Sequence, residues 1–304
     1  PSKSAAVLER GRTTMNLWQQ YLSPRSIPEA IQALTSAPGA AVPIAGGTDL
    51  LLDLQQGRHA PVHTLIDLTT VLELNQLEVR NGQLFIGAAV PLSRIARHLL
   101  VAQHAQALVE ACDLVGGPQV RNVATLGGNV AHALPAADGT IALLALDAEA
   151  EIADRSGLRR LPLSDLFLGP GKSALKHGEE LLVGLYIPLM KPHQASCFKR
   201  IMRPQGVALP IINLAIRISR DGFAITEIRI AVGPGAAIPW RAEQAEHALV
   251  GKQLNQAAID AALEVLLAQV GFRSSPRRAS SEYRRHLVWA LFKDTLETAW
   301  KRAG

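Results

Sequence analysis

The sequence predicts an α+β protein of about two domains, and three observations support this prediction. The chain has 304 residues, and a domain usually takes about 100–200 of them. Hydrophobic residues make up 48% of the chain and charged residues 19%, which excludes a disordered chain and provides enough apolar material for real cores. Short apolar strands and helical patterns also follow one another along the whole sequence, without an internal repeat.

The first segment, residues 15–72, is predicted to form a compact βαβ-like subdomain. Ser26 and Glu29 make a Ser-x-x-Glu capping box, in which each side chain can satisfy an orphan amide at the start of a helix. Asp49 is placed to cap a second helix, which Gly57 ends. In order, we expect a helix after Ser26, a strand at 41–44, a helix at 50–56 and a strand at 64–68.

The second segment, residues 73–190, has a different rhythm and is predicted to form a second subdomain. Pro188 ends its last strand, because proline cannot donate to a sheet ladder. The expected elements are a strand at 84–90, helices at 92–100 and 104–112, a glycine-rich stretch at 116–138, a helix at about 140–146, and strands at 148–153 and 181–187.

A third region, residues 195–304, is predicted to be a smaller α+β domain with strands, a glycine turn and two helices. Residues 1–14 carry basic residues but no apolar segment of a secretory signal, so we expect a disordered extension. The elements expected in the third region are strands at 208–218 and 225–232, a turn at 233–235, and helices near 257–270 and 281–302.

Charge and cysteine usage restrict the class of protein. The formal net charge is +5, and residues 195–304 carry 16 basic against 9 acidic side chains, a net of +7. Such a basic region suits nucleic acid or an acidic protein partner, although solvated helix faces explain most runs of this kind. Cys112 and Cys197 are too few for a disulfide framework, a zinc site or an iron–sulfur cluster, which favours a cytoplasmic setting. No apolar run reaches the ~18 residues of a membrane span.

Two glycine pairs carry the chemistry. Residues 45–50 read Ala-Gly-Gly-Thr-Asp-Leu, and residues 125–130 read Thr-Leu-Gly-Gly-Asn-Val, followed by Pro-Ala-Ala-Asp at 135–138. Paired glycines let successive amides converge on an anion such as a pyrophosphate, and Asn129 and Asp138 suit sugar or ribityl hydroxyls. Either pair alone is compatible with an ordinary tight turn.

Two familiar nucleotide motifs do not fit this sequence. No Gly-x-Gly-x-x-Gly follows a strand and opens a helix, which excludes a Rossmann fingerprint. The stretch Gly169–Ser173 is superficially similar to a P-loop, but Leu166 stands where its first glycine should be. We therefore do not expect nucleotide hydrolysis.

Taken together, these motifs resemble the FAD-binding medium subunit of molybdenum hydroxylases, the family of xanthine dehydrogenase and carbon monoxide dehydrogenase. The resemblance runs from about Met15 to the C-terminus, and its most specific part is Arg-Asn-Val-Ala-Thr-Leu-Gly-Gly-Asn at 121–129. Further matching segments are Leu84-Phe-Ile-Gly-Ala, Phe167-Leu-Gly-Pro-Gly-Lys-Ser, Glu180-Leu-Leu-Val-Gly-Leu-Tyr-Ile-Pro, Phe198-Lys-Arg-Ile-Met-Arg-Pro-Gln-Gly and Ser281-Glu-Tyr-Arg-Arg.

The resemblance implies a two-subdomain FAD-binding fold of the PCMH and vanillyl-alcohol-oxidase type over residues 15–190, with a C-terminal α+β domain at 195–304. It implies that both glycine segments hold the FAD pyrophosphate, that Leu181 or Leu182 touches the flavin, and that Lys199 lies near the flavin edge. The implied cofactor-binding residues are Ile44, Ala45, Gly46, Gly47, Thr48, Asp49, Leu50, Val115, Gly116, Thr125, Gly127, Gly128, Asn129, His132, Asp138, Leu181, Leu182 and Lys199.

The sequence departs from the family at two positions and lacks one insertion. His132 stands where the family often has a small hydroxyl residue, and Leu134 replaces a common serine. His132 could bond a phosphate or ring oxygen, or be a spectator at the rim. Members that reduce aromatic acyl-CoA esters carry a cysteine-rich insertion, which the two cysteines here exclude.

The resemblance implies an oxidoreductase subunit that relays electrons from [2Fe–2S] clusters through FAD to NAD, a quinone or O2, without a catalytic side chain or metal of its own. An iron–sulfur small subunit and a molybdopterin large subunit would complete a dimer of heterotrimers. Lys199 or Arg203 near the ring would raise the flavin potential. One alternative is a stand-alone reductase of the UDP-sugar type. Another is a basic nucleic-acid module, which the 4% aromatic content disfavours.

Overall fold

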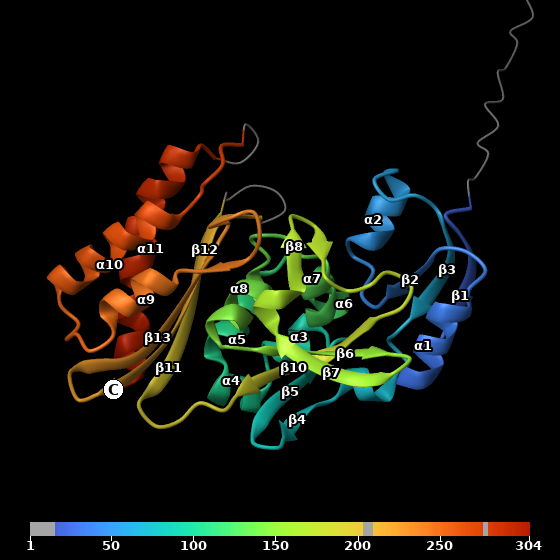
Figure 1. The fold of residues 1–304 in the computed structure, drawn as a ribbon, viewed down its shortest axis with the longest axis horizontal. Helices are drawn as coiled ribbons and strands as arrows, with labels where there is room; N and C mark the ends of the chain where they lie inside the picture. Colours follow the sequence, from blue (N-terminus) through green and yellow to red (C-terminus); the bar gives the residue numbers. More distant parts are fainter. Residues whose placement is uncertain (1–15, 203–208, 276–278) are drawn as a thin grey trace, which may run out of the picture.

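The computed structural model describes residues 16–202, 209–275 and 279–304. The expected extension at 1–14, like Arg203, lies outside these ranges. Figure 1 shows three units in chain order, with the central unit between the small N-terminal unit and the C-terminal one. No helix in the described ranges combines the length and apolar character needed to cross a membrane.

The N-terminal unit is a parallel three-stranded sheet with the strand order β1-β3-β2. The strand predicted at 41–44 has the predicted bounds. Strand β1 was not predicted, because four of its five residues are exposed and it lacks the alternation of a half-buried strand. The elements are β1 (Trp18–Leu22), α1 (Ile27–Ser36), β2 (Ala41–Ile44), α2 (Leu50–Gln55) and β3 (Val62–Asp67).

The two predicted helix caps in this unit behave differently. The Ser26 hydroxyl accepts a 3.3 Å hydrogen bond from the Glu29 amide, as predicted, but the Glu29 carboxylate accepts from the Arg25 amide at 2.8 Å instead of closing the box. The prediction for Asp49 was wrong. It stands at the N-cap position of α2 without a side-chain cap bond, because its backbone (φ −99°, ψ −49°) is already helical and not extended.

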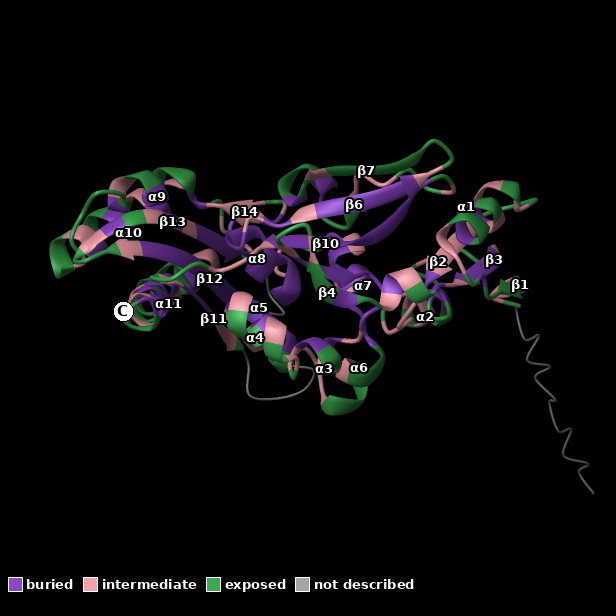
Figure 2. Cartoon of the chain, turned by 90° about the horizontal axis from the view of Figure 1, so that it is seen from below, coloured by how far each residue is buried: buried purple, intermediate pink, exposed green. Residues whose placement is uncertain are grey.

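The central unit is an antiparallel five-stranded sheet with the order β4-β5-β10-β6-β7. Its middle strand β10 is buried along nearly its whole length, as Figure 2 shows. The strands are β4 (Leu77–Arg80), β5 (Gln83–Gly87), β6 (Glu149–Asp154), β7 (Gly157–Pro162) and β10 (Leu181–Pro188). The helices are α3 (Leu92–Ile95), α4 (Leu99–His104), α5 (Gln106–Leu114), α6 (Pro118–Val123), α7 (Leu126–Ala131) and α8 (Asp138–Ala145), with 3₁₀ turns at Leu72–Asn75 and Leu163–Leu166.

The single helix predicted at 92–100 is in fact two helices, α3 and α4, separated by an extended His98 (φ −88°, ψ 126°). Ile95 and Val101 are both fully buried. In one continuous helix these two side chains would point about 120° apart, so the break lets both face the core. The stretch 169–173 joins β8 (Phe167–Gly169) and β9 (Lys172–Ser173) in a hairpin and does not open a helix, unlike a P-loop.

The C-terminal unit is an antiparallel sheet with the order β11-β12-β13-β14. Figure 1 shows helices α10 and α11 on its outer side and α5 and α8 of the central unit on the other. The helix predicted at 281–302 has the predicted bounds. The elements are β11 (Gln194–Met202), β12 (Pro210–Asp221), β13 (Ala224–Gly233), β14 (Trp240–Arg241), α9 (Glu243–Leu249), α10 (Gln256–Gln269) and α11 (Ser281–Arg302).

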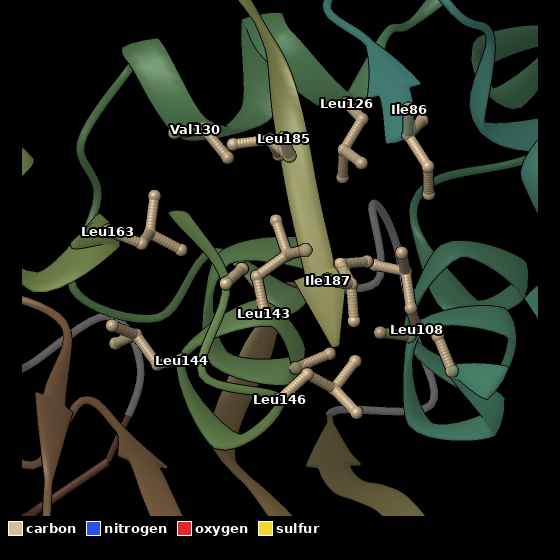
Figure 3. Packing of buried hydrophobic residues seen from close by; sticks show 14 of the residues in the cluster. Ile86, Leu108, Leu126, Val130, Leu143, Leu144, Leu146, Leu163, Leu185 and Ile187 are labelled. Carbon is tan, nitrogen blue, oxygen red and sulfur yellow. The ribbon is translucent and has the colours of Figure 1, made fainter. Parts of the chain in front are cut away.

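Two hydrophobic clusters of the central unit include residues of the neighbouring units. The main core fills the space between β10 and the helices of the central unit, and Figure 3 shows Leu143 and Ile187 within it, with Leu108 from α5 beside them. Phe198 and Ala215, from the C-terminal sheet, belong to the same core. A second cluster on the opposite face of β10 packs against α1 of the N-terminal unit.

Ion pairs and polar contacts close the boundary between the central and C-terminal units. The Asp147 carboxylate, just after α8, accepts from three arginines of the C-terminal sheet, with N–O distances of 2.7–3.1 Å. Glu110 on α5 accepts from the Phe198 amide at 2.7 Å and pairs with Arg302 at 2.6 Å. The three arginines are Arg217, Arg229 and Arg241.

Candidate functional site

A cavity of about 920 Å³ lies where the three units meet, and both glycine segments line it. Its volume is at the upper end of the ~300–1,000 Å³ typical of small-molecule and cofactor sites. All but four of the predicted site residues line it. Those in its wall are Ile44, Ala45, Gly46, Gly47, Thr48, Asp49, Leu50, Val115, Gly116, Thr125, Gly128, Asn129, His132 and Asp138.

The first glycine segment is the turn from β2 into α2. A Cβ atom on Gly46 would lie 2.2 Å from the carbonyl oxygen of Val123, so only glycine lets this turn approach the end of α6. Gly47 has φ +65°, a left-handed conformation that costs glycine little. The turn therefore presents bare backbone to the cavity, which is what close approach of an anion requires.

The second glycine segment begins α7. Thr125 has an extended backbone and its hydroxyl accepts a 3.1 Å hydrogen bond from the Gly128 amide, which makes it the N-cap. Gly128 lines the cavity, whereas Gly127 faces away, where an added Cβ would lie 2.5 Å from Ala88. The two glycines thus have different uses, one for exposed backbone and one for packing.

Asn129 and Asp138, expected to serve sugar hydroxyls, also have structural partners. The Asn129 side-chain oxygen accepts from the Thr140 amide at 3.2 Å and so joins α7 to α8. Asp138 is 4% exposed and forms an ion pair with Arg200 of β11. The Asn213 amide, from β12, donates to the same carboxylate at 2.6 Å. Contacts of both residues with a cofactor stay predictions.

Burial raises the pKa of the Asp138 carboxyl, and the Arg200 guanidinium and the Asn213 amide oppose that shift. Asn213 also donates to the Ala136 carbonyl at 3.0 Å, and Arg200 to the Leu114 carbonyl. Arg200 and Asn213 were not among the predicted site residues. Their partner lies 62 and 75 positions away, and no local pattern in the sequence signals such a pair.

His132 and Asp49 meet in the cavity wall. His132 ends α7, and its Nδ1 lies 3.7 Å from Oδ1 of Asp49, in the turn before α2. The other Asp49 oxygen accepts from the Thr48 hydroxyl at 3.3 Å. This pair joins the two glycine segments, which come from different units.

Leu181, Leu182 and Lys199 do not line the cavity. Leu181 belongs to the core on the α1 side of the central sheet and Leu182 to the main core on its other face. The Lys199 ammonium lies 2.6 Å from Asp294 and 2.9 Å from the Thr298 hydroxyl, both on α11. Neighbouring residues of a strand point to opposite faces, so Arg200 and not Lys199 reaches the cavity from β11.

Part of the cavity wall is apolar and open. Four large apolar side chains in it are 37–53% exposed, which leaves apolar surface that a flat ring system could cover. They come from α2, α6, the loop after α7 and the position just before β12. These side chains are Leu52, Val120, Leu134 and Leu209.

The cysteines are part of the cores and not of the cavity wall. Cys112 and Cys197 are buried free thiols. Burial raises the pKa of the Cys112 thiol and raises that of Cys197 to about 12. Within the three described ranges, no three His, Cys, Asp or Glu side chains gather closely enough to hold a metal ion.

Comparison with known proteins gives a consistent assignment. Residues 14–190 match the FAD binding domain in molybdopterin dehydrogenase, and residues 196–299 match the CO dehydrogenase flavoprotein C-terminal domain. The xanthine dehydrogenase FAD-binding subunit of Escherichia coli O157:H7 is 33% identical over 93% of this chain and 97% of that protein. The nicotinate dehydrogenase FAD-subunit of Eubacterium barkeri is 29% identical over 90% and 93%.

A solved structure agrees with these sequence matches. A chain of carbon monoxide dehydrogenase from Hydrogenophaga pseudoflava superimposes with a TM-score of 0.89 and 27% identity, covering 94% of this chain and 98% of that one. The resemblance to xanthine and carbon monoxide dehydrogenase subunits is thereby confirmed, as is the α+β fold. The chain belongs to the family of FAD-binding medium subunits of xanthine dehydrogenases and carbon monoxide dehydrogenases, and it is the FAD-binding part of an oxidoreductase.

Proposed function

We propose that this chain relays electrons, through FAD in the cavity, from [2Fe–2S] clusters on a partner subunit to a soluble acceptor, which is NAD, a quinone or O2. The observation that carries the proposal is the cavity itself, in which two stretches of bare backbone face an open apolar wall. That combination suits a dinucleotide with a doubly negative pyrophosphate and a flat ring.

The residues present fit FAD. Gly46, Gly47 and Thr48 from one side, and Thr125 and Gly128 from the other, would hold the pyrophosphate through backbone amides and hydroxyls. The cradle depends on missing side chains, since a Cβ on Gly46 would collide with the backbone of Val123. A ligand held by amides needs few cations, which agrees with a binding region that carries no excess positive charge.

Apolar residues would hold the ring. Ile44 and Leu50 flank the first turn, and Val115 and Val120 also line the cavity. Covering their surface would exclude water from the ring and orient it. FAD supplies the one- and two-electron chemistry when bound, so the side chains are needed for binding and electrostatics.

The names of two relatives support the proposed partners. One is named as the medium chain of carbon monoxide dehydrogenase and another as an FAD-subunit of nicotinate dehydrogenase. By analogy, an iron–sulfur small subunit and a molybdopterin large subunit would assemble with this chain into a dimer of heterotrimers in the cytoplasm. The substrate would then be oxidised on the large subunit.

The test is purification of the native complex, followed by its visible spectrum and the masses of its chains. We expect FAD absorbance, iron–sulfur absorbance, and one smaller and one larger partner chain. Mixing the anaerobically reduced complex with NAD, a quinone or O2 in a stopped-flow instrument then identifies the acceptor by the fastest return of flavin absorbance. A colourless chain that purifies alone would contradict the proposal.

A further inference from the structure

We propose that His132 is a positioning residue that neutralises Asp49 beside the pyrophosphate and holds the two glycine segments together, so that retention of FAD depends on the charge of one histidine. This inference rests on the proposed function, because it takes the pyrophosphate to lie between the two segments.

Three carboxylates line the cavity in the described residues, and each lies within 4.0 Å of a basic side chain. Asp53 pairs with Arg58 at 2.6 Å, and Asp138 pairs with Arg200. Asp49 pairs with His132. An arginine keeps its charge at any physiological pH, whereas a histidine changes charge between about pH 5 and pH 8. Asp49 is therefore the one carboxylate of the three whose partner is a histidine.

Asp49 also has the most exposed position next to the expected anion. Its side chain is 63% exposed, against 26% for Asp53 and 5% for Asp138. It directly follows Gly47 and Thr48, which would hold the pyrophosphate. An unpaired carboxylate there would repel the two phosphate charges, and solvent would screen part of that repulsion. A protonated imidazole 3.7 Å from the carboxylate would offset its charge.

His132 is held in place to do this. Its amide donates to the Gly128 carbonyl at 3.1 Å, so the ring is carried by the last turn of α7. The ring is 34% exposed and reaches from the central unit to the turn of the N-terminal unit. The close approach of Gly46 to Val123 brings the first segment against the residues just before the second, so the contact between His132 and Asp49 adds to one that the backbone has already set.

Other ionisable groups in the cavity wall have different positions. His59 bonds the Ala60 carbonyl through Nδ1 at 2.7 Å. On the C-terminal side, Arg273 and Arg284 line the wall with Arg200. Arginines do not titrate near neutral pH. A pH effect between about pH 6 and pH 8.5 that disappears on replacing His132 therefore reports on His132 and not on His59.

The experiment measures the dissociation constant of FAD for the deflavinated complex, by quenching of flavin fluorescence, at about pH 6 and about pH 8.5. The proteins are the wild type, His132→Gln, Asp49→Asn and the double variant. His177→Gln is the matched control, because His177 is exposed and does not line the cavity. Thermal unfolding of each protein checks that it is folded.

We expect the wild type to bind FAD about two- to fivefold more tightly at the lower pH, the range that a partly exposed ion pair supplies. His132→Gln should bind more weakly and without pH dependence. Asp49→Asn should bind FAD well and also without pH dependence. Adding Asp49→Asn to His132→Gln should restore the binding that His132→Gln alone loses. His177→Gln should behave as the wild type does.

Three results would overturn the inference. One is a pH dependence that survives in His132→Gln or in Asp49→Asn. Another is that His132→Gln weakens FAD binding equally in the wild type and in Asp49→Asn, which would mean that His132 contacts the cofactor directly. The third is an unchanged dissociation constant in His132→Gln. By contrast, a folded wild-type complex that does not take up FAD at either pH would contradict the proposed function itself.

Discussion

The glycine wall of the cavity and the boundary between the central and C-terminal units are built on opposite principles. In the wall, Gly46 and Gly128 expose backbone, and Ala45 and Thr48 beside Gly46 and Gly47 have small side chains. At the boundary, buried and half-buried ion pairs are dense, with three arginines on Asp147 alone. The wall offers backbone amides to a charged ligand, whereas the charged side chains at the boundary are already paired with one another.

This contrast predicts that the largest effect comes from breaking the most buried pair at the boundary. Arg200→Met should lower the free energy of unfolding by about 3–5 kcal/mol, because it leaves the Asp138 carboxylate buried without its cation. Urea unfolding of the assembled complex measures this. The double variant with Asp138→Leu should recover much of the loss, and a double variant as unstable as the single one would contradict the account.

The next effect should come from the glycine wall. Gly46→Ala would place a methyl group 2.2 Å from the Val123 carbonyl oxygen and force the turn away from α6. We expect a cost of about 1–3 kcal/mol in unfolding free energy and FAD binding weakened by at least about tenfold. Calorimetry and flavin fluorescence measure the two effects.

Gly117→Ala is the matched control for that variant. Gly117 has φ −91°, and an added Cβ would meet only the end of the Gln119 side chain, at 3.1 Å. It should leave both quantities close to wild type. Equal losses in the two glycine variants would show that the close approach of Gly46 to α6 is not what shapes the wall.

A smaller effect is expected at the half-exposed part of the boundary. Asp147→Asn should cost about 1–3 kcal/mol, because three arginines lose a shared negative charge and one of its two acceptor oxygens, at a side chain that is only 26% exposed. Asp221→Asn, on the exposed β12–β13 turn, should cost nothing measurable. Thermal unfolding compares the two variants. Identical unfolding midpoints would mean that the three arginines have sufficient partners other than Asp147.

The smallest effect should come from Lys199→Met. Its ammonium is paired with an Asp294 side chain that is 63% exposed, and such pairs contribute less than about 1 kcal/mol. Since Lys199 faces α11, the flavin potential measured by dye titration should not change. A shift of the flavin potential in Lys199→Met would instead support the predicted position of Lys199 near the flavin edge.

The sequence predicted elements whose signals are local. The final helix begins at Ser281 as predicted, and the Ser280 hydroxyl caps it by accepting from the Tyr283 amide at 3.1 Å. The strand at 41–44 is bounded by its own apolar run and the glycines that follow. The glycine segments were also found in this way, since their chemistry lies in the residues themselves.

Features that depend on distant partners could not be predicted in the same way. Strand β1 is held by pairing with β3, more than forty residues later, and its own residues are largely exposed. Lys199 and Arg200 are adjacent cations, and only the facing of β11 decides which of them reaches the cavity. The engagement of Asp138 by Arg200 and Asn213 is likewise decided by how two units pack.

The double-sided burial of the C-terminal sheet has a consequence for protein engineering. Strand β12 is buried along ten consecutive residues, because α11 covers one face of the sheet and α5 and α8 cover the other. A hybrid that takes this domain from a relative must therefore take α5 and α8 with it. The part of the chain that can be exchanged as a unit is therefore not one continuous stretch of sequence. Such a hybrid needs junctions before α5 and after α8, as well as one between β10 and β11.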